Sequence, residues 1–238
     1  MNSEYTHRFF EDISSGSMRS AQIIAPLVHS LAPVTSVLDV GCGTGAWLRA
    51  FQECGVTVLS GLDGEYVDRS QLLIDHRLFT PCDLQRATSL PTGFDLVVCL
   101  EVLEHLPNSA GLRLVSLMTQ SAPLILFSAA MPGQGGTHHI NERWHEHWHL
   151  EFLKHGYATI DCIREKVFAE RQVAPWFRQN IFLYAAPDAY NKYPHLLTLR
   201  EAKAPGVVPI CPHVLRQFTS TRGLVRALLR HLVRQICG

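Results

Sequence analysis

Short apolar runs alternate with amphipathic stretches along the first half of this chain, and this alternation limits the fold more than any other feature. Apolar runs of this length indicate buried strands, and most of the stretches between them have helical periodicity. Strands that alternate with helices favour a parallel sheet with helices on both faces. The expected strands are residues 36–40, 57–62, 78–82, 94–100 and 123–129.

The pattern changes after residue 155, where two more strand candidates follow each other closely. They are "HGYATIDCIREKVF" (155–168) and "NIFLYAA" (180–186). The gap between them is short for a helical crossover, so we expect an antiparallel pair at one edge. The expected fold class is α/β: a doubly wound, seven-stranded, mostly parallel sheet with an antiparallel edge strand.

Composition excludes several classes of protein. A length of 238 residues is typical of one globular domain with modest additions. With 21 basic and 21 acidic side chains, the chain lacks the excess positive charge of most nucleic-acid-binding proteins. Its seven cysteines include no C-x-x-C pair, which argues against a zinc site or a disulfide framework and favours a reducing compartment. No apolar stretch is long enough to cross a membrane, so we expect a cytoplasmic protein.

A glycine-rich loop follows the first expected strand, in "VLDVGCGTGAWL" (37–48). Gly41, Gly43 and Gly45 allow a sharp turn and close approach of a ligand to the backbone. The loop would lie at the carboxyl end of the strand, where open α/β sheets bind ligands. Asp39 beside it disfavours a bare pyrophosphate and suits a ligand with a positively charged amino group.

The next three strands also end in acidic side chains. Asp63 follows Asp39 by 24 residues, close to the spacing at which a carboxylate holds a ribose. Asp83, in "CDLQ", lies where it could accept a hydrogen bond from an adenine amine, and Glu101 begins the polar segment of "FDLVVCLEVLEHLP". Each aspartate, taken alone, could instead cap a helix or stabilise a turn.

Taken in order, these motifs resemble the class I S-adenosylmethionine-dependent methyltransferases over roughly residues 35–130. The resemblance implies a Rossmann-like methyltransferase fold and S-adenosyl-L-methionine as cofactor. The resemblance implies that the three glycines approach the methionine part of the cofactor. It also implies that the backbone at Leu100 lies at the amino group and that Glu101 lies near the sulfonium. Under the same resemblance, Asp39 binds the amino group of the cofactor and Asp63 binds its ribose. Asp83 and Leu84 contact its adenine.

Residues 127–157 contain the candidate catalytic side chains, because they begin at the ligand-binding edge and include a glycine-rich loop. His138 or His139 could act as a general base near neutral pH. We favour His139, with Glu142 close enough in sequence to orient it. A histidine that only caps or packs the following helix is the alternative.

A metal site is a second interpretation of the same stretch. His145 and His149 are four residues apart and would share a helix face, with His138, His139, Glu142 or Glu146 as further ligands. The pattern is not H-E-x-x-H, however, and a packed helix face beside Trp144 and Trp148 is the interpretation we prefer, with no metal expected. In "EVLEHL", helical spacing indicates that Glu104 and His105 face solvent or support a helix.

Three segments are expected. Residues 1–34 would form a helical lid, in which Tyr5, Phe9 and Phe10 could cover the cofactor, or these side chains could only pack on the domain. Residues 35–190 would form the S-adenosylmethionine-binding catalytic domain. Residues 191–238 would form an extension with an amphipathic helix, in which Arg222, Arg226, Arg230 and Arg234 make a basic stripe. That helix could contact an anionic membrane or a partner, or pack on the domain with its arginines in solvent.

We therefore expect methyl transfer to an oxygen, or secondarily a nitrogen, of a small molecule or glycan. One alternative is a cofactor-binding regulatory or partner module without transferase activity. The other is a nucleic-acid methyltransferase, which the balanced charge and the absence of an Asn-Pro-Pro-aromatic motif disfavour. The acceptor and the oligomeric state do not follow from the sequence.

Overall fold

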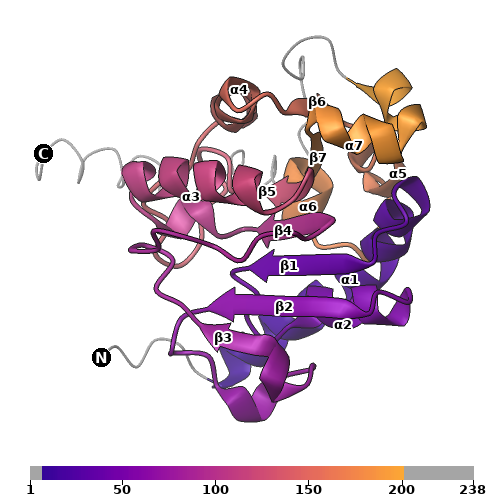
Figure 1. The fold of residues 1–238 in the computed structure, drawn as a ribbon. Coiled ribbons are helices and arrows are strands. Elements are labelled where there is room, and N and C mark those ends of the chain that lie inside the picture. Colours follow the sequence, from indigo (N-terminus) through magenta and orange to yellow (C-terminus); the bar gives the residue numbers. More distant parts are fainter. Residues whose placement is uncertain (1–6, 201–238) are drawn as a thin grey trace, which may run out of the picture.

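A seven-stranded sheet forms the centre of the molecule, as the computed structural model shows (Figure 1). The structure describes the backbone of residues 7–200 and the side chains of residues 16–200. The strand order is β3-β2-β1-β4-β5-β7-β6. The strands are β1 (Ser36–Val40), β2 (Val58–Asp63), β3 (Phe79–Pro81), β4 (Leu96–Leu100), β5 (Leu124–Ser128), β6 (Ala158–Ile160) and β7 (Phe182–Ala185).

The connections contain both α-helices and short 3₁₀ turns. The α-helices are α1 (His7–Leu31), α2 (Ala46–Glu53), α3 (Asn108–Ser121), α4 (His145–Lys154), α5 (Arg164–Val167), α6 (Pro175–Asn180) and α7 (Pro187–Lys192). The 3₁₀ turns are η1 (Arg69–Gln71), η2 (His76–Leu78), η3 (Leu103–His105) and η4 (Pro194–Leu199).

The first five strands are parallel, as predicted, and this brings their carboxyl ends to one edge of the sheet. In the centre, Asp39 of β1 is in register with Gly61 of β2 on one side and with Val98 of β4 on the other. Side chains that follow these strands along the chain therefore gather at a common edge, although they are far apart in sequence.

The antiparallel pair at the other side of the sheet is also confirmed. β7 runs antiparallel to β5, with Phe127 opposite Phe182, and antiparallel to β6, with Ile160 opposite Leu183. The antiparallel strand is therefore second from the edge, and β6 is outermost. Only the short helices α5 and α6 connect β6 to β7, which is too little chain for a crossover to a parallel neighbour.

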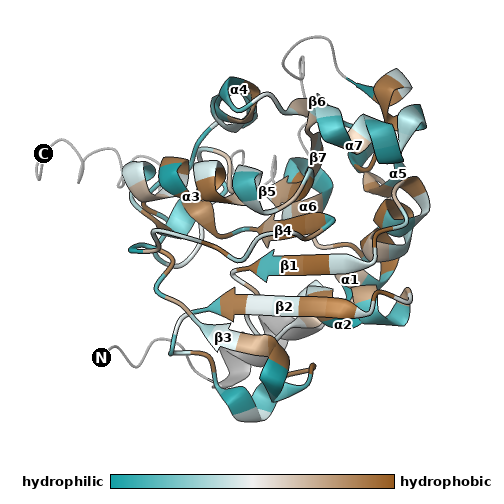
Figure 2. Cartoon of the chain, viewed as in Figure 1, coloured by the Kyte–Doolittle hydropathy of each residue, from teal (hydrophilic) through white to brown (hydrophobic). Residues whose placement is uncertain are grey.

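Alternate residues of the strands build two cores, one on each face of the sheet. Val37 packs into a core with α1 and α2, whereas the next residue, Leu38, packs into a core with α3 and α4. The same alternation in all central strands explains why they are hydrophobic on both sides, as Figure 2 shows for most of β4. The sheet is therefore doubly wound, with helices on both faces.

Two connections differ from the expected helices. Between β2 and β3 the chain forms only the 3₁₀ turns η1 and η2, and residues 82–95, between β3 and β4, form no helix. "EVLEHL" also forms the 3₁₀ turn η3 rather than an α-helix, so the expectation of a helix there is wrong.

The part of α1 whose side chains are described, from residue 16 on, packs in the core. Ala21, Ile24 and Val28 are fully buried, and the Ser20 hydroxyl accepts a hydrogen bond from the Ala174 N–H. The lid over the cofactor stays a prediction, because Tyr5 and the side chains of Phe9 and Phe10 lie outside the described residues. The basic helix expected within 201–238 lies outside them too. Among the described helices, none has the length and hydropathy needed to cross a membrane.

Candidate active site

The glycine loop connects β1 to α2 with three residues in left-handed backbone conformations. Gly41, Gly43 and Gly45 have φ angles of 85°, 52° and 83°. A Cβ atom on Gly41 would lie 2.3 Å from Cγ2 of Val102, and one on Gly45 would lie 2.8 Å from Cγ1 of Ile74. Conformation and space both require glycine at positions 41 and 45, as the sequence pattern predicts, whereas at position 43 only the conformation favours it.

Asp39 lies beneath this loop, 2% exposed, and its Oδ2 atom has no hydrogen-bond partner among the described residues. Burial, and then the charge of Asp63, raise the pKa of Asp39 well above its usual range. An isolated buried carboxylate is costly unless a donor or a positive charge compensates it. The protonated amino group of S-adenosylmethionine would supply both, so this residue fits the expected cofactor.

Asp63 ends β2 and joins it to the glycine loop. Its Oδ2 atom accepts a hydrogen bond from the Gly43 N–H at 2.7 Å, and Oδ1 accepts from the Gly64 N–H at 2.7 Å and from the Tyr66 hydroxyl. These bonds place the carboxylate at the expected edge of the sheet. Its predicted role with a ribose would require the ribose hydroxyls to replace Tyr66 as donor.

Asp83 and Leu84 follow β3, but they face different surroundings. The Asp83 carboxylate accepts a hydrogen bond from the Gln85 N–H at 3.0 Å and forms an exposed ion pair with Arg86, which agrees with the turn alternative. Leu84 is buried with Leu62 of β2. Their contact with adenine stays a prediction.

Glu101 directly follows Leu100, the last residue of β4, and its backbone is also left-handed, with φ at 56°. Its carboxylate accepts hydrogen bonds from Nε2 of Gln134 at 2.7 Å and from Nδ2 of Asn180 at 3.3 Å. Asn180 also donates to Oε1 of Gln134 at 2.7 Å. Burial raises the pKa of Glu101. No sequence motif indicated the two amide partners, which come from a loop and from α6.

Glu142 closes the loop that contains Gln134. Its Oε2 atom accepts from the Gly133 N–H at 2.8 Å, and its Oε1 atom accepts from the Gly135 N–H at 2.8 Å and lies 3.2 Å from Nδ1 of His139. These bonds outweigh the effect of burial and lower the pKa of Glu142. The predicted pairing of His139 with an ionised Glu142 is present, and His138 lies beside it with a left-handed backbone, at φ 58°.

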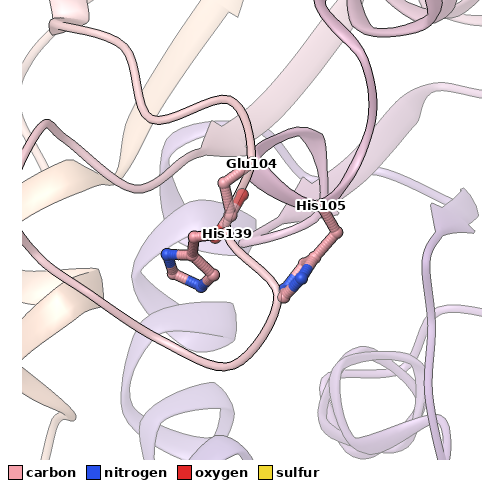
Figure 3. A group of neighbouring side chains, drawn as sticks. All are labelled: Glu104, His105 and His139. Carbon is pink, nitrogen blue, oxygen red and sulfur yellow. The ribbon is translucent and has the colours of Figure 1, made fainter. Parts of the chain in front are cut away.

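A second connection holds His139 against the turn η3. The backbone N–H groups of Ile140 and Asn141 both donate to the carbonyl oxygen of Glu104, at 2.9 and 3.0 Å. The His139 ring consequently meets the His105 ring edge-on, with centroids 4.8 Å apart. Figure 3 shows Glu104, His105 and His139 side by side.

Glu104 is fully buried in this cluster, and neither of its carboxylate oxygens has a hydrogen-bond partner among the described residues. The expectation that it faces solvent or supports a helix is wrong, because η3 turns it inward below the 138–142 segment. Potential metal-ligand atoms of Glu104, His105 and His139 all lie within 4.8 Å of one another. Sequence spacing could not reveal this group, since His139 is 34 positions from His105.

The two histidines of the alternative metal interpretation, His145 and His149, have structural partners. Nε2 of His145 lies 3.0 Å from Oδ1 of Asn180, and Nδ1 of His149 contacts the Thr159 hydroxyl. Within residues 16–200, the one group of histidine and acidic side chains close enough to share a metal is the cluster at η3. Trp148 is buried in the core, as expected, whereas Trp144 is 58% exposed.

Comparison with known proteins indicates the same protein family as the sequence motifs and the geometry of the site. Residues 4–180 match a family model described as a methyltransferase domain. Over 102 residues the chain is 37% identical to a ubiquinone biosynthesis O-methyltransferase of Pseudomonas syringae, and over 124 residues it is 34% identical to one of Thiobacillus denitrificans. These matches cover 39% and 46% of this chain and 43% and 51% of the relatives, so they span only about half of those proteins.

Two solved structures share the fold at low identity. Magnesium protoporphyrin IX methyltransferase from Synechocystis PCC 6803, solved with bound SAH, has a TM-score of 0.52 and 17% identity over 78% of this chain and 90% of its own. An amino pentose methyltransferase from Micromonospora echinaspora, solved with bound SAM, has a TM-score of 0.53 and 18% identity over 78% and 99%. The family match covers most of the chain, and the chain therefore belongs to the methyltransferase-domain family, the class I S-adenosylmethionine-dependent methyltransferases.

Proposed function

We propose that this protein transfers the methyl group of S-adenosylmethionine to a hydroxyl oxygen of a small molecule. The names of the ubiquinone-biosynthesis relatives favour oxygen as acceptor and favour a hydroxylated aromatic precursor of a quinone as the first substrate to test. The observation that carries the proposal is the contact between His139 and Glu142 at the edge of the sheet where the glycine loop lies.

The cofactor would lie against the glycine loop, with its amino group at Asp39 and its ribose at Asp63. When bound, it supplies a methyl group already activated by a sulfonium, so the protein has to align the acceptor oxygen, exclude water and remove one proton. Gln134 and Asn180 hold Glu101 in place beside this position.

His139 is suited to removing that proton. Glu142 contacts Nδ1, which leaves Nε2 to accept the proton of the acceptor hydroxyl. The ionised Glu142 then stabilises the positive imidazolium that results. Glu142 also accepts hydrogen bonds from Gly133 and Gly135, so the loop keeps the pair in a fixed orientation.

The test compares the intact protein with His139→Ala. Methyl transfer to hydroxylated aromatic acceptors is followed by mass spectrometry, and the Kd for S-adenosylmethionine by calorimetry. We expect kcat to fall about 10²- to 10⁴-fold, the usual contribution of a general base, while the Kd stays nearly unchanged. His155→Ala is the matched control, because His155 pairs with Glu151 at the other end of α4 and should leave kcat unchanged.

Two outcomes would contradict the proposal. An equal loss of turnover and of cofactor affinity in His139→Ala would remove its role as a base. Cofactor binding by the intact protein without transfer to any acceptor would favour the alternative of a cofactor-binding module without transferase activity.

A further inference from the structure

We propose that Tyr66 competes with the ribose of S-adenosylmethionine for the carboxylate of Asp63, so that the protein limits its own affinity for the cofactor. The Tyr66 hydroxyl donates a hydrogen bond to Oδ1 of that carboxylate. The inference rests on the proposed function, which places the ribose at Asp63, but cofactor binding is measurable without any methyl transfer.

The first support is the way in which donors share the Asp63 carboxylate. Oδ2 accepts from the Gly43 N–H, whereas Oδ1 accepts from both the Gly64 N–H and the Tyr66 hydroxyl. Two hydrogen bonds fill the lone pairs of Oδ1, so a ribose hydroxyl has to replace one of these donors. The glycine donor is a backbone group, whereas the Tyr66 donor is on a side chain and can leave without any movement of the backbone.

The second support is the position of the Tyr66 ring against Gly64. A Cβ atom on Gly64 would lie 2.2 Å from Cε1 of Tyr66, so the ring occupies space that only a glycine leaves open. This position holds the hydroxyl at the carboxyl end of β2, where Asp63 is the last residue of the strand. The ring therefore lies at the same edge of the sheet as the proposed ribose position.

The third support is the contrast between Tyr66 and its neighbour Val67. Tyr66 is 73% exposed, whereas Val67 is 6% exposed and belongs to the core cluster that contains Ile74. The Val67 N–H also donates to the Gly64 carbonyl oxygen at 3.2 Å. The backbone of this turn is therefore anchored, while the Tyr66 side chain loses little packing when it rotates into solvent.

Two positions of the Tyr66 side chain then set the apparent affinity for the cofactor. With the hydroxyl on Asp63, Oδ1 is filled, and with the ring turned into solvent, Oδ1 can accept from a ribose hydroxyl. The measured Kd equals the intrinsic Kd divided by the fraction of molecules in which the ring is turned out. S-adenosylhomocysteine, the product of methyl transfer, carries the same ribose, so Tyr66 weakens the retention of product by the same factor.

The experiment measures the Kd of S-adenosylmethionine and of S-adenosylhomocysteine by calorimetry, for the full-length protein and for Tyr66→Phe, without acceptor. The substitution removes the hydroxyl, keeps the ring and lies at an exposed position, so the variant should fold normally. We expect both ligands to bind about three- to tenfold more tightly, the equivalent of one hydrogen bond that no longer competes. Tyr193→Phe is the matched control, because its hydroxyl donates to the Pro33 carbonyl before β1 begins, and its Kd values should not change.

A second measurement follows the displacement of Tyr66 itself. In protein labelled with 3-fluorotyrosine, the fluorine resonance of Tyr66 is the one that Tyr66→Phe lacks. We expect saturation with S-adenosylhomocysteine to move this resonance towards the frequency of a tyrosine in solvent. The resonance of Tyr193 should stay in place, because that residue lies away from the carboxyl ends of the strands.

The results separate this inference from the proposed function. Unchanged binding in Tyr66→Phe would overturn it, and so would a Tyr66 resonance that the ligand does not move. Weaker binding in Tyr66→Phe would also overturn it, because the hydroxyl would then contact the cofactor instead of competing with it. Each of these results leaves the proposed function intact, whereas failure of the intact protein to bind either ligand would contradict both.

Discussion

Two buried carboxylates, Asp39 and Glu104, lie at the candidate active site with oxygens that no described residue bonds. Each has its pKa raised, mainly by burial. Folding alone does not explain such groups, because burying an acid without donors destabilises a protein. A positively charged ligand would offset that cost, and for Asp39 the proposed ligand is the amino group of the cofactor.

Asp39→Asn tests this explanation at the cofactor site. The amide keeps the size of the side chain but removes the charge that would attract an amino group. We expect at least about tenfold weaker binding of S-adenosylmethionine by calorimetry, in line with the loss of a buried charge-assisted hydrogen bond. The melting temperature of the cofactor-free protein should not fall. A variant that melts much earlier would show instead that Asp39 stabilises the fold.

Among the elements, the carboxyl ends of the strands are joined by hydrogen bonds from backbone N–H groups as well as by packing. The Gly43 N–H donates to Asp63 across β1 and β2, and the Glu101 N–H donates to the Ser128 carbonyl across β4 and β5. The loop that carries Glu142 is held in a similar way. The site is therefore built on rigid strand ends, which suits the alignment that methyl transfer requires.

Substitution of the loop glycines by alanine separates the clash of an added Cβ atom from the cost of a left-handed backbone conformation. Gly41→Ala adds a Cβ atom 2.3 Å from the Val102 side chain, whereas Gly43→Ala adds one with no atom within 4 Å. Both residues are left-handed, which costs alanine about 1–2 kcal/mol. In urea unfolding we expect Gly41→Ala to lose more stability than Gly43→Ala, since Val102 must also move. Equal losses would show that the loop relaxes around the added carbon.

At the scale of the whole molecule, Asp95 links segments that are distant in sequence. Its carboxylate accepts hydrogen bonds from the Thr35 N–H at 2.7 Å and from Nζ of Lys192 in α7 at 2.7 Å. Burial alone would raise the pKa of Asp95, but the bonds from Lys192 and Thr35 outweigh it and lower the pKa to about 2. One side chain thus joins the start of β1 to the end of α7.

This lowered pKa makes the contribution of Asp95 depend on pH. Because the folded-state pKa lies below the usual value of about 3.9, the stabilisation is present above about pH 4 and is lost as the pH falls toward 2. We expect Asp95→Asn to lower the free energy of unfolding by about 1–3 kcal/mol at pH 7 and by less at pH 3, measured with urea. Asp83→Asn, at an exposed pair, should change little at either pH.

Most of the fold was predictable because strand and helix patterns are local. The apolar runs placed the first five strands within about two residues of their observed ends, and the short gap before "NIFLYAA" predicted the antiparallel pair. One failure was also local: "EVLEHL" has helical spacing but forms only a 3₁₀ turn, in which Glu104 is buried directly after β4.

The cofactor half of the site was more predictable than the acceptor half. Asp39, the glycines and Asp63 each follow a strand, so the parallel sheet alone brings them to one edge. The contact of Glu142 with His139 was also within reach, since the two are three residues apart. The partners of Glu101 were not, because Gln134 and Asn180 approach it from segments whose paths depend on packing.

The parallel sheet, its ligand-binding edge and the glycine loop therefore follow from the amino-acid pattern, because periodicity and left-handed turns are properties of neighbouring residues. The contacts of Glu104 and His105 with His139, and the lack of a partner for Oδ2 of Asp39 among the described residues, depend instead on how the chain packs. Those facts depend on which loop lies over which strand end. The free energy of that arrangement comes from contacts between residues far apart in the chain, which no local pattern records.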